Sequence, residues 1–244
     1  MPAMTAALTE PVVKFDPYQL KTTAVREGDE YVLNGSKTAV PLAETAELIL
    51  VYANEDGQTQ AFLVPTSAAG LAIEKKAKLM GIKGLPTNLV TLSDCRVPAE
   101  NKLGGADGID FGLILNHSRV ALGAAAVGVA RAGYEYALDY AKQRVQFGEP
   151  IGHKQSIAFM LADMATDIDE ARLLVWEAAW QMDLGKDVTR DVTLMKQRVD
   201  AIVVQVADRA LQVLGGYGYI REYPVELWLR NARGFASFDG LAIV

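Results

Sequence analysis

One long stretch, residues 115–148, constrains the fold of this chain more than any other part. Between residues 120 and 140 it contains no proline, and residues of small bulk dominate. Gly123, Gly128 and Gly133 each cost a helix about 1 kcal/mol relative to alanine. Close packing against neighbouring helices would offset this cost. We therefore predict a buried helix here, packed against other helices.

Arg144 follows this predicted helix and precedes a Phe-Gly-Glu-Pro turn at residues 147–150. A guanidinium fork beside an aromatic ring and a flexible corner suits a phosphate or pyrophosphate group. An arginine in this place also neutralises the negative end of the helix dipole. The local pattern alone favours this second interpretation, so the anion-binding hypothesis depends on what other motifs indicate.

Composition excludes several classes of protein. The 244 residues allow one or two domains, and the net charge of −6 leaves no electrostatic footprint for nucleic acid. Cys95 is the single cysteine, which excludes an intrachain disulfide and fits a reducing compartment with a packing role for the thiol. The two histidines, His117 and His153, are far apart in the sequence, so no zinc motif is present and no metal site is predicted.

Neither a signal peptide nor a membrane span is expected. Residues 1–8 lack the basic head and the long apolar core of a signal peptide. The apolar run at residues 120–130 is far shorter than the roughly 20 residues needed to cross a bilayer. We therefore expect a cytoplasmic protein.

From residue 20 to about residue 103 the pattern is that of β-structure. Short apolar runs alternate with turn signals at residues 26–29, 34–35 and 54–57, of which Asn34-Gly35 is a strong hairpin signal. The regular spacing of these signals predicts an antiparallel sandwich or barrel of roughly seven strands.

After Gly104-Gly105 the periodicity becomes helical. Apolar residues recur at helical spacing over residues 107–142, 155–182 and 188–214, and a short helix is expected after Pro224 over residues 225–230. The prediction is therefore an α+β protein. Its β domain would occupy residues 1–104, and an antiparallel helical bundle would occupy residues 105–244.

Three short motifs have both a structural and a functional interpretation. Gly215-Gly216-Tyr217-Gly218 closes a predicted helix, and its surplus glycines would also let a ligand approach the backbone. Leu8-Thr9-Glu10-Pro11 could be only the start of a turn, or its threonine hydroxyl and backbone amides could hydrogen-bond the polar edge of a ligand ring. Asp239, before Gly240, is a turn residue or the carboxylate of a site. The residues alone leave each alternative open.

Taken in order, the motifs of this chain closely resemble those of the acyl-CoA dehydrogenase family. The resemblance covers nearly the whole chain and lies in residues 8–11, 33–38, 80–84, 97–104, 144–148, 161–164, 211–218 and 222–226. It implies a middle β domain and a C-terminal four-helix bundle that hold FAD between them. It also implies paired subunits that share each flavin.

The resemblance further implies roles for individual residues. Those expected to bind FAD are Leu8, Thr9, Arg144, Phe147, Gln155, Gln212, Gly215 and Gly216, with Arg144 at the pyrophosphate of the neighbouring subunit's cofactor. Arg119 and Gly240 are expected to bind the acyl-CoA. Asp239 is expected to be the base that takes the α-proton while the β-hydrogen leaves as hydride to the flavin.

The implied activity is that of an oxidoreductase of fatty acid metabolism acting on a CH–CH group. The implied partners are acyl-CoA, an electron-transferring flavoprotein as acceptor, and further subunits. A homo-oligomer would be a dimer or tetramer, and a hetero-oligomer would include a paralogue of this chain. Acyl chain length is not encoded in any of these motifs.

The chain also departs from the family pattern. It begins at the β domain, without a counterpart of the family's N-terminal helical domain, and Asp239 stands where a glutamate is usual. Residues 14–16 and 39–41 replace motifs expected beside the flavin, and Pro41 has no N–H to donate. These departures motivate an alternative, a non-catalytic subunit that completes the flavin site of a full-length paralogue. A third possibility is a fragment whose bundle exposes apolar surface.

Overall fold

The computed structural model describes residues 3–74 and 76–239. The chain forms two compact units. The first, called here the β unit, comprises Met1–Leu79, Lys83–Leu115 and Phe238–Val244. The second, the helical unit, comprises Met80–Ile82 and Asn116–Ser237.

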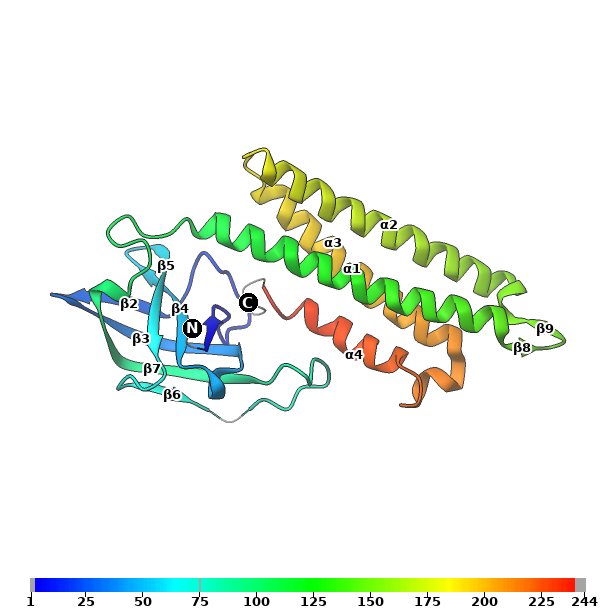
Figure 1. Cartoon of the computed structure of the whole chain (residues 1–244), viewed down its shortest axis with the longest axis horizontal. Helices are drawn as coiled ribbons and strands as arrows, with labels where there is room; N and C mark the ends of the chain where they lie inside the picture. Colours follow the sequence, from blue (N-terminus) through cyan, green and yellow to red (C-terminus); the bar gives the residue numbers. More distant parts are fainter. Residues whose placement is uncertain (1–2, 75, 240–244) are drawn as a thin grey trace. The chain divides into compact units, whose positions relative to one another are not determined.

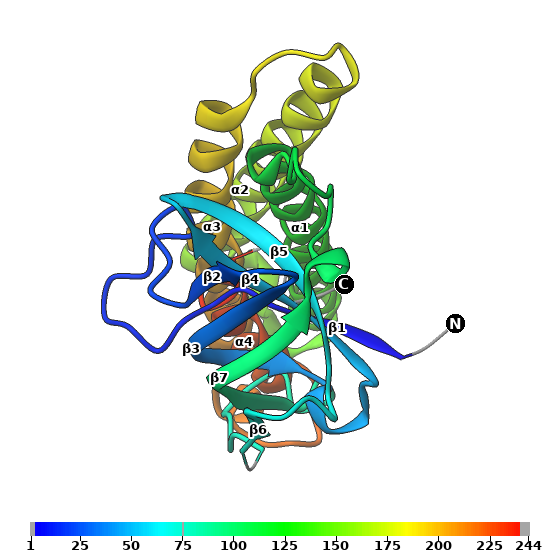
Figure 2. The same cartoon turned by 90° about the vertical axis from the view of Figure 1, so that its left-hand side faces the viewer.

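The β unit contains one curled sheet of seven strands, which Figure 2 shows facing the viewer. Its strands are β1 Met4–Ala7, β2 Thr23–Glu27, β3 Glu30–Pro41, β4 Leu48–Glu55, β5 Gln58–Pro65, β6 Leu71–Ile73 and β7 Thr87–Pro98. The strand order is β1-β4-β2-β3-β7-β6, with β5 paired to β4. The predicted β architecture is confirmed, but the sheet is not wholly antiparallel, because β1 and β2 both pair with β4 in parallel.

Two of the three predicted turns are confirmed. Gly28 lies between β2 and β3, and Asp56-Gly57 joins β4 to β5 with both residues at positive φ. The hairpin predicted at Asn34-Gly35 is wrong, because β3 continues through it. There the pairing with β7 shifts register as at a β-bulge, and Gly35 (φ 146°) lies so close to Thr22 that a Cβ would be 2.6 Å from its Oγ1.

The core of the β unit has two parts. The larger part consists mainly of buried side chains of the strands and includes the fully buried Cys95. Burial raises the pKa of the Cys95 thiol. The smaller is built on Tyr52, Leu8 and the first residues of a long helix, Phe111 and Leu115. Leu8 is therefore a core residue, which fixes the start of the segment that follows β1.

The helical elements are those predicted, with small changes at their ends (Figure 1). The long helices are α1 Phe111–Gln143, α2 Gln155–Asp183 and α3 Thr189–Leu214, and the short one is α4 Val225–Phe235. Between them lie a two-stranded ribbon, β8 Val145–Gln146 and β9 Glu149–Pro150, and the 3₁₀ turns η3 Ile151–His153 and η4 Gly215–Tyr219. Two more turns, η1 Ala43–Thr45 and η2 Ala99–Asn101, belong to the β unit.

Helix α1 begins where Asp110 caps it, its Oδ1 accepting the N–H of Leu113 at 2.9 Å. Of the three glycines at residues 123, 128 and 133, only Gly123 lies where a Cβ would come closer to a neighbouring helix than ordinary van der Waals contact. A Cβ on Gly123 would lie 2.9 Å from Met195 Sδ, and one on Gly133 would lie 3.5 Å from the Cβ of Ala210. The prediction of burial is only half right, because one face of α1 packs in the bundle and the other is exposed in the single chain.

Helix α1 is also longer than its most apolar run. Its 33 residues include a segment apolar enough to cross a membrane by length and composition alone, so the length argument made from residues 120–130 is wrong. Of that segment, 39% is buried within the protein. We interpret α1 as a core helix of the bundle, because the core helix of a soluble protein can have the same length and apolar composition as a membrane-spanning helix.

A three-residue segment, Met80–Ile82, packs on α4 within the helical unit. The N–H of Ile82 donates to Asn231 Oδ1 at 2.7 Å, and the Arg230 guanidinium donates to the Met80 carbonyl at 2.8 Å. Gly81 is required at the contact, because a Cβ there would lie 1.9 Å from the Arg230 carbonyl oxygen. This contact joins α4 to residues about 150 positions earlier in the chain.

Candidate functional site

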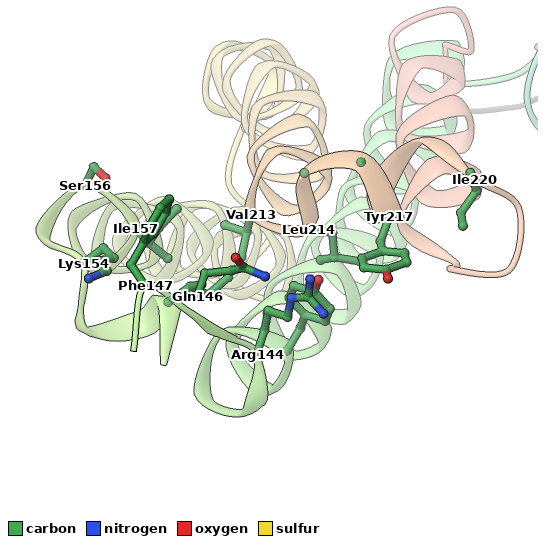
Figure 3. A pocket seen from close by; sticks show the side chains of 14 residues that line it. Arg144, Gln146, Phe147, Lys154, Ser156, Ile157, Val213, Leu214, Tyr217 and Ile220 are labelled. Atoms are coloured by element: carbon green, nitrogen blue, oxygen red, sulfur yellow. The ribbon is translucent and has the colours of Figure 1, made fainter. Parts of the chain in front are cut away.

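The helical unit contains an open cavity of about 560 Å³ at the end of α1 (Figure 3). The ribbon β8–β9, the start of α2 and the turn η4 complete its walls. Its lining residues are Tyr140, Arg144, Gln146, Phe147, Ile151, Lys154, Ser156, Ile157, Val213, Leu214, Gly215, Gly216, Tyr217 and Ile220. The cavity therefore collects Arg144, Phe147, Gly215 and Gly216, four of the residues predicted to bind FAD.

Arg144 is placed by the backbone on both of its sides. Its N–H donates to the Tyr140 carbonyl at 2.8 Å, and its own carbonyl accepts the N–H of Ile151 at 2.8 Å. Phe147 (φ 56°) and Gly148 (φ 84°) form the two-residue loop of the ribbon, with the paired positive φ values of a type I′ turn. The last turn of α1 thus passes directly into a tight hairpin, and Arg144 stands at the junction.

The Arg144 guanidinium lies over the ring of Tyr217, 5.3 Å from the ring centroid. Within the described residues no carboxylate forms an ion pair with Arg144, so its charge is balanced only by the ring and by the helix end. The exposed Phe147 ring instead faces Lys154, whose Nζ is 6.0 Å from its centroid and also pairs with Glu149. Two cationic side chains therefore border the cavity.

The glycines of η4 do different things. Gly215 (φ 60°) ends α3, and its N–H donates to the Gln212 carbonyl, so it is the helix cap. Gly218 is required for packing, because a Cβ there would lie 2.4 Å from the Leu211 carbonyl oxygen. A Cβ on Gly216 would meet nothing within 4 Å. Since neither conformation nor packing within the described residues requires Gly216, its bare backbone fits close approach by a ligand.

Two of the predicted FAD ligands, Gln155 and Gln212, are exposed and do not line the cavity. Each is a sequence neighbour of a lining residue, Lys154 and Val213 respectively. Lys154 and Tyr217 line the cavity and were not predicted from the sequence. Tyr217 stands inside the glycine motif and could have been noticed there, whereas no local signal distinguishes Lys154 from other surface lysines.

Leu8 and Thr9 belong to the β unit, at the end of β1. The Leu8 carbonyl accepts a hydrogen bond from the ammonium of Lys37 at 3.1 Å, and the Thr9 carbonyl accepts one from the N–H of Thr38 at 2.8 Å. Lys37 is fully buried and forms an ion pair with Glu10 at 2.8 Å. The segment that the resemblance assigns to the flavin ring is thus held to β3 by its backbone carbonyls.

The residues predicted to handle the substrate lie in both units. In the helical unit Arg119 is half-buried, with Nη1 3.5 Å from Thr193 Oγ1, and the neighbouring Asn116 is buried and donates to Thr189 Oγ1 at 3.2 Å. In the β unit the half-buried Asp239 follows the buried Phe238. Gly240 lies outside the described residues.

Comparison with family models matches two segments of the chain. Residues 5–95 match the model described as acyl-CoA dehydrogenase, middle domain. Residues 111–242 match the model described as acyl-CoA dehydrogenase, C-terminal domain. The two matches are collinear and together cover both units of the fold.

Individual relatives agree with the family models. A caffeyl-CoA reductase-Etf complex subunit, CarC, of Acetobacterium woodii is 38% identical over 98% of this chain, and an acyl-CoA dehydrogenase of Bacillus subtilis is 38% identical over 96%. The structure of butyryl-CoA dehydrogenase from Megasphaera elsdenii matches with a TM-score of 0.86 and 35% identity over 99% of this chain. The chain spans 65%, 64% and 65% of these three proteins, respectively.

Proposed function

Because this chain belongs to the acyl-CoA dehydrogenase family, whose members are FAD-dependent flavoproteins, we propose that it takes part in α,β-dehydrogenation of an acyl-CoA thioester. The observation that carries the proposal is the cavity that Arg144 and Gly216 both line. An arginine without a carboxylate partner among the described residues and a backbone without a side chain are the groups that a diphosphate selects.

The residues at this cavity fit the dinucleotide part of FAD. Arg144 supplies positive charge, the Gly215-Gly216 corner lets an anion reach the backbone, and Tyr217 and Phe147 offer aromatic surface. Lys154 adds an ammonium group that is already paired with Glu149. Following the family resemblance, the dinucleotide here would be that of a second subunit, with Gln155 and Gln212 as further contacts. We accordingly propose an oligomer, a dimer or tetramer, in which this face of the helical unit meets another subunit.

The β unit would contact the flavin ring through Leu8 and Thr9. When bound, FAD supplies the hydride acceptor for the β-hydrogen of the substrate. Arg119 would bind the CoA portion, and the backbone N–H of Gly240 would hydrogen-bond the thioester carbonyl. The carboxylate of Asp239 would take the α-proton, because it is the acid that the motifs place in the position of the family base.

Two matched proteins suggest an acceptor. The Acetobacterium woodii relative is a subunit of a caffeyl-CoA reductase-Etf complex, and another matched structure concerns the electron transferring flavoprotein of Acidaminococcus fermentans. We propose that an electron-transferring flavoprotein reoxidises the cofactor here. We expect the protein to act in fatty acid metabolism in the cytoplasm. We also propose that its two domains are a β domain at residues 1–104 and a helical domain at residues 105–244.

A second candidate function is that of a non-catalytic subunit, which one feature of β3 supports. Residues 39–41 stand where the resemblance expects groups that hydrogen-bond the flavin. Val40 is a core residue, and Pro41 has no N–H, while its carbonyl accepts a hydrogen bond from Thr5 Oγ1 at 2.5 Å. Such a subunit would contribute Arg144 and the Gly215-Gly216 corner to the flavin of a full-length paralogue.

Flavin binding by the purified chain separates the two functions. The chain is purified alone, mixed with FAD, and its visible spectrum is recorded before and after anaerobic addition of acyl-CoAs of several lengths. Yellow protein that bleaches supports the dehydrogenase. Colourless protein that acquires flavin only on mixing with a full-length paralogue supports the non-catalytic subunit. Protein that binds no flavin under either condition would disprove both.

A further inference from the structure

The β unit buries an ammonium group that has no role in the proposed reaction. The side chain of Lys37, in β3, has no exposed surface, although it belongs to a residue type that is almost never fully buried. Its Nζ donates to Glu10 Oε1 at 2.8 Å and to the Leu8 carbonyl at 3.1 Å. Both contacts lie within the four-residue motif at residues 8–11.

Glu10 connects this ammonium to the next part of the chain. Its Oε2 accepts the N–H of Lys21 at 2.7 Å, and its Oε1 accepts the N–H of Thr22 at 2.8 Å. The carboxylate is itself buried, with 4% of Glu10 exposed. Three donors, from β3 and from residues 21–22, therefore bind the Glu10 carboxylate. These bonds fix the position of Glu10, which directly follows Thr9.

Thr38, the residue after Lys37 in β3, also binds the segment at residues 8–10. The N–H of Thr38 donates to the Thr9 carbonyl at 2.8 Å. Consecutive residues of β3 thus bind consecutive carbonyls, Lys37 through its side chain to Leu8 and Thr38 through its backbone to Thr9. The path of the segment at residues 8–10 is fixed at three successive positions.

Stability alone does not explain this arrangement. A buried ion pair costs desolvation energy, and apolar residues of similar volume often replace such a pair without loss of stability. Burial lowers the pKa of Lys37 to about 8, so the ammonium is retained against an unfavourable environment. What an apolar replacement would not provide is a donor to the Leu8 carbonyl.

We propose that Lys37 is a positioning residue, which fixes the Leu8–Glu10 backbone so that Thr9 presents its hydroxyl and amide groups to the flavin ring. The inference rests on the proposed function for its last clause, the contact with flavin. The first clause, that Lys37 sets the path of this segment, concerns only the residues of this chain.

Lys37→Met in the full chain removes the donor and keeps the length of the side chain. The readouts are amide hydrogen exchange at Thr38 and at Val51, a fully buried residue of β4, and the dissociation constant for FAD. We expect exchange at Thr38 to accelerate about tenfold, the factor for one hydrogen bond of about 1.4 kcal/mol, with exchange at Val51 changed much less. FAD binding should weaken by a similar factor.

The matched control is Lys102→Met. Lys102 forms an ion pair with Glu55 at 2.7 Å in the same unit, with side chains only 9% and 15% exposed, and contacts neither Leu8 nor Thr9 through any bond found in the described residues. The control should leave exchange at Thr38 and FAD affinity unchanged. A change at Thr38 equal to that of Lys37→Met would overturn the inference, because loss of any buried pair would then suffice.

A second variant is needed because Lys37→Met leaves the buried Glu10 carboxylate without its ammonium partner and could prevent folding. Glu10→Gln with Lys37→Met removes both charges, so no unpaired charge is buried, and the glutamine oxygen still accepts from one of the two amides, Lys21 or Thr22. The faster exchange at Thr38 should persist in it. Unchanged exchange at Thr38 in either folded variant would disprove the positioning role. If the wild-type chain never binds FAD, the proposed function fails, and exchange at Thr38 still decides whether Lys37 fixes the segment.

Discussion

The guanidinium carbon of Arg144 lies 5.3 Å from the centre of the Tyr217 ring, and both residues line the cavity of the helical unit. The ring holds the cation at the end of α1 without neutralising it, which a carboxylate in the same place would do. Tyr217 also packs against Tyr223, with ring centroids 5.2 Å apart. The cation is therefore oriented before any anion arrives, which lowers the entropic cost of binding one.

Replacing Arg144 should remove most of the diphosphate affinity. We expect Arg144→Gln to weaken FAD binding about 10- to 100-fold, the range for a charge-assisted hydrogen bond, with little change in thermal stability. Titration followed by flavin fluorescence measures the affinity. Arg131→Gln is the control, since Arg131 lies on the same helix and pairs with Glu135 away from the cavity. Equal losses in the two variants would contradict the assignment.

Removing the ring under the cation should have a smaller effect. Tyr217→Leu should weaken FAD binding about two- to fivefold, because an exposed cation–π contact contributes about 0.5–1 kcal/mol. Tyr219→Leu, at an 87% exposed residue of the same turn that does not line the cavity, should leave the affinity unchanged. The same titration checks both variants. An unaltered affinity in Tyr217→Leu would mean that the ring does not orient Arg144.

Gly216 and Gly218 should respond in opposite ways to alanine. Gly216→Ala has open space for its Cβ, so its unfolding free energy should change by less than about 0.5 kcal/mol while FAD affinity falls. Gly218→Ala would clash with the Leu211 carbonyl and should lose about 1–3 kcal/mol of stability. Denaturant titrations and FAD binding, measured side by side, test this. Full affinity in Gly216→Ala would show that no ligand approaches that backbone.

Asp239 should be needed for proton removal and not for flavin binding. In a chain or complex that bleaches with acyl-CoA, Asp239→Asn should slow bleaching about 10²- to 10⁴-fold with flavin still bound, the usual contribution of a general base. Stopped-flow absorbance measures the rate. Asp56→Asn, in the exposed turn between β4 and β5, is the control. Bleaching at the wild-type rate in Asp239→Asn would exclude Asp239 as the base.

The Glu10–Lys37 pair should make stability depend on pH in the acid range. Burial alone would raise the pKa of Glu10, but Lys37 and the amides around it lower that pKa below its ordinary value of 4.5. A carboxyl with a lowered folded-state pKa binds more protons when unfolded, so its stabilisation is present above pH 4.5 and is lost as pH falls through the folded-state pKa.

Urea titrations of the wild type and Glu10→Gln at several pH values check this dependence. The difference in unfolding free energy between them should shrink on acidification below about pH 4.5. Other carboxylates contribute equally to both proteins and cancel in the difference. A difference that stays constant down to the acid limit of folding would contradict the lowered pKa of Glu10.

Turns were predictable from the sequence only where short-range geometry decides them. Gly28 and Gly57 supply the positive φ that their hairpins need, and both turns formed as expected. Asn34-Gly35 carries the same local signal, yet β3 passes through it, because Thr22 needs room against Gly35 and β7 pairs on the other side. Strand β1, four residues long, was missed since its parallel partner β4 begins more than 40 residues later.

The candidate site shows the same division. Arg144 and the glycines Gly215 and Gly216 stand in motifs that the sequence displays, and these residues line one cavity of the helical unit. The neighbour of the Arg144 guanidinium is not predictable from the sequence, because Phe147 is adjacent in sequence whereas Tyr217 comes from the turn after α3. That pairing depends on how α1 and α3 pack, which no local pattern specifies.

The contact of Met80–Ile82 with α4 bears on any attempt to dissect the protein. The backbone passes between the two units at residues 79–80, 82–83, 115–116 and 237–238. A bundle fragment beginning at residue 105 would leave Asn231 and the Arg230 guanidinium without the backbone groups they bind. A chimera that exchanges only the helical bundle between relatives would therefore lose the contact between α4 and residues 80–82. A stable chimera would have to exchange Met80–Ile82 together with the bundle.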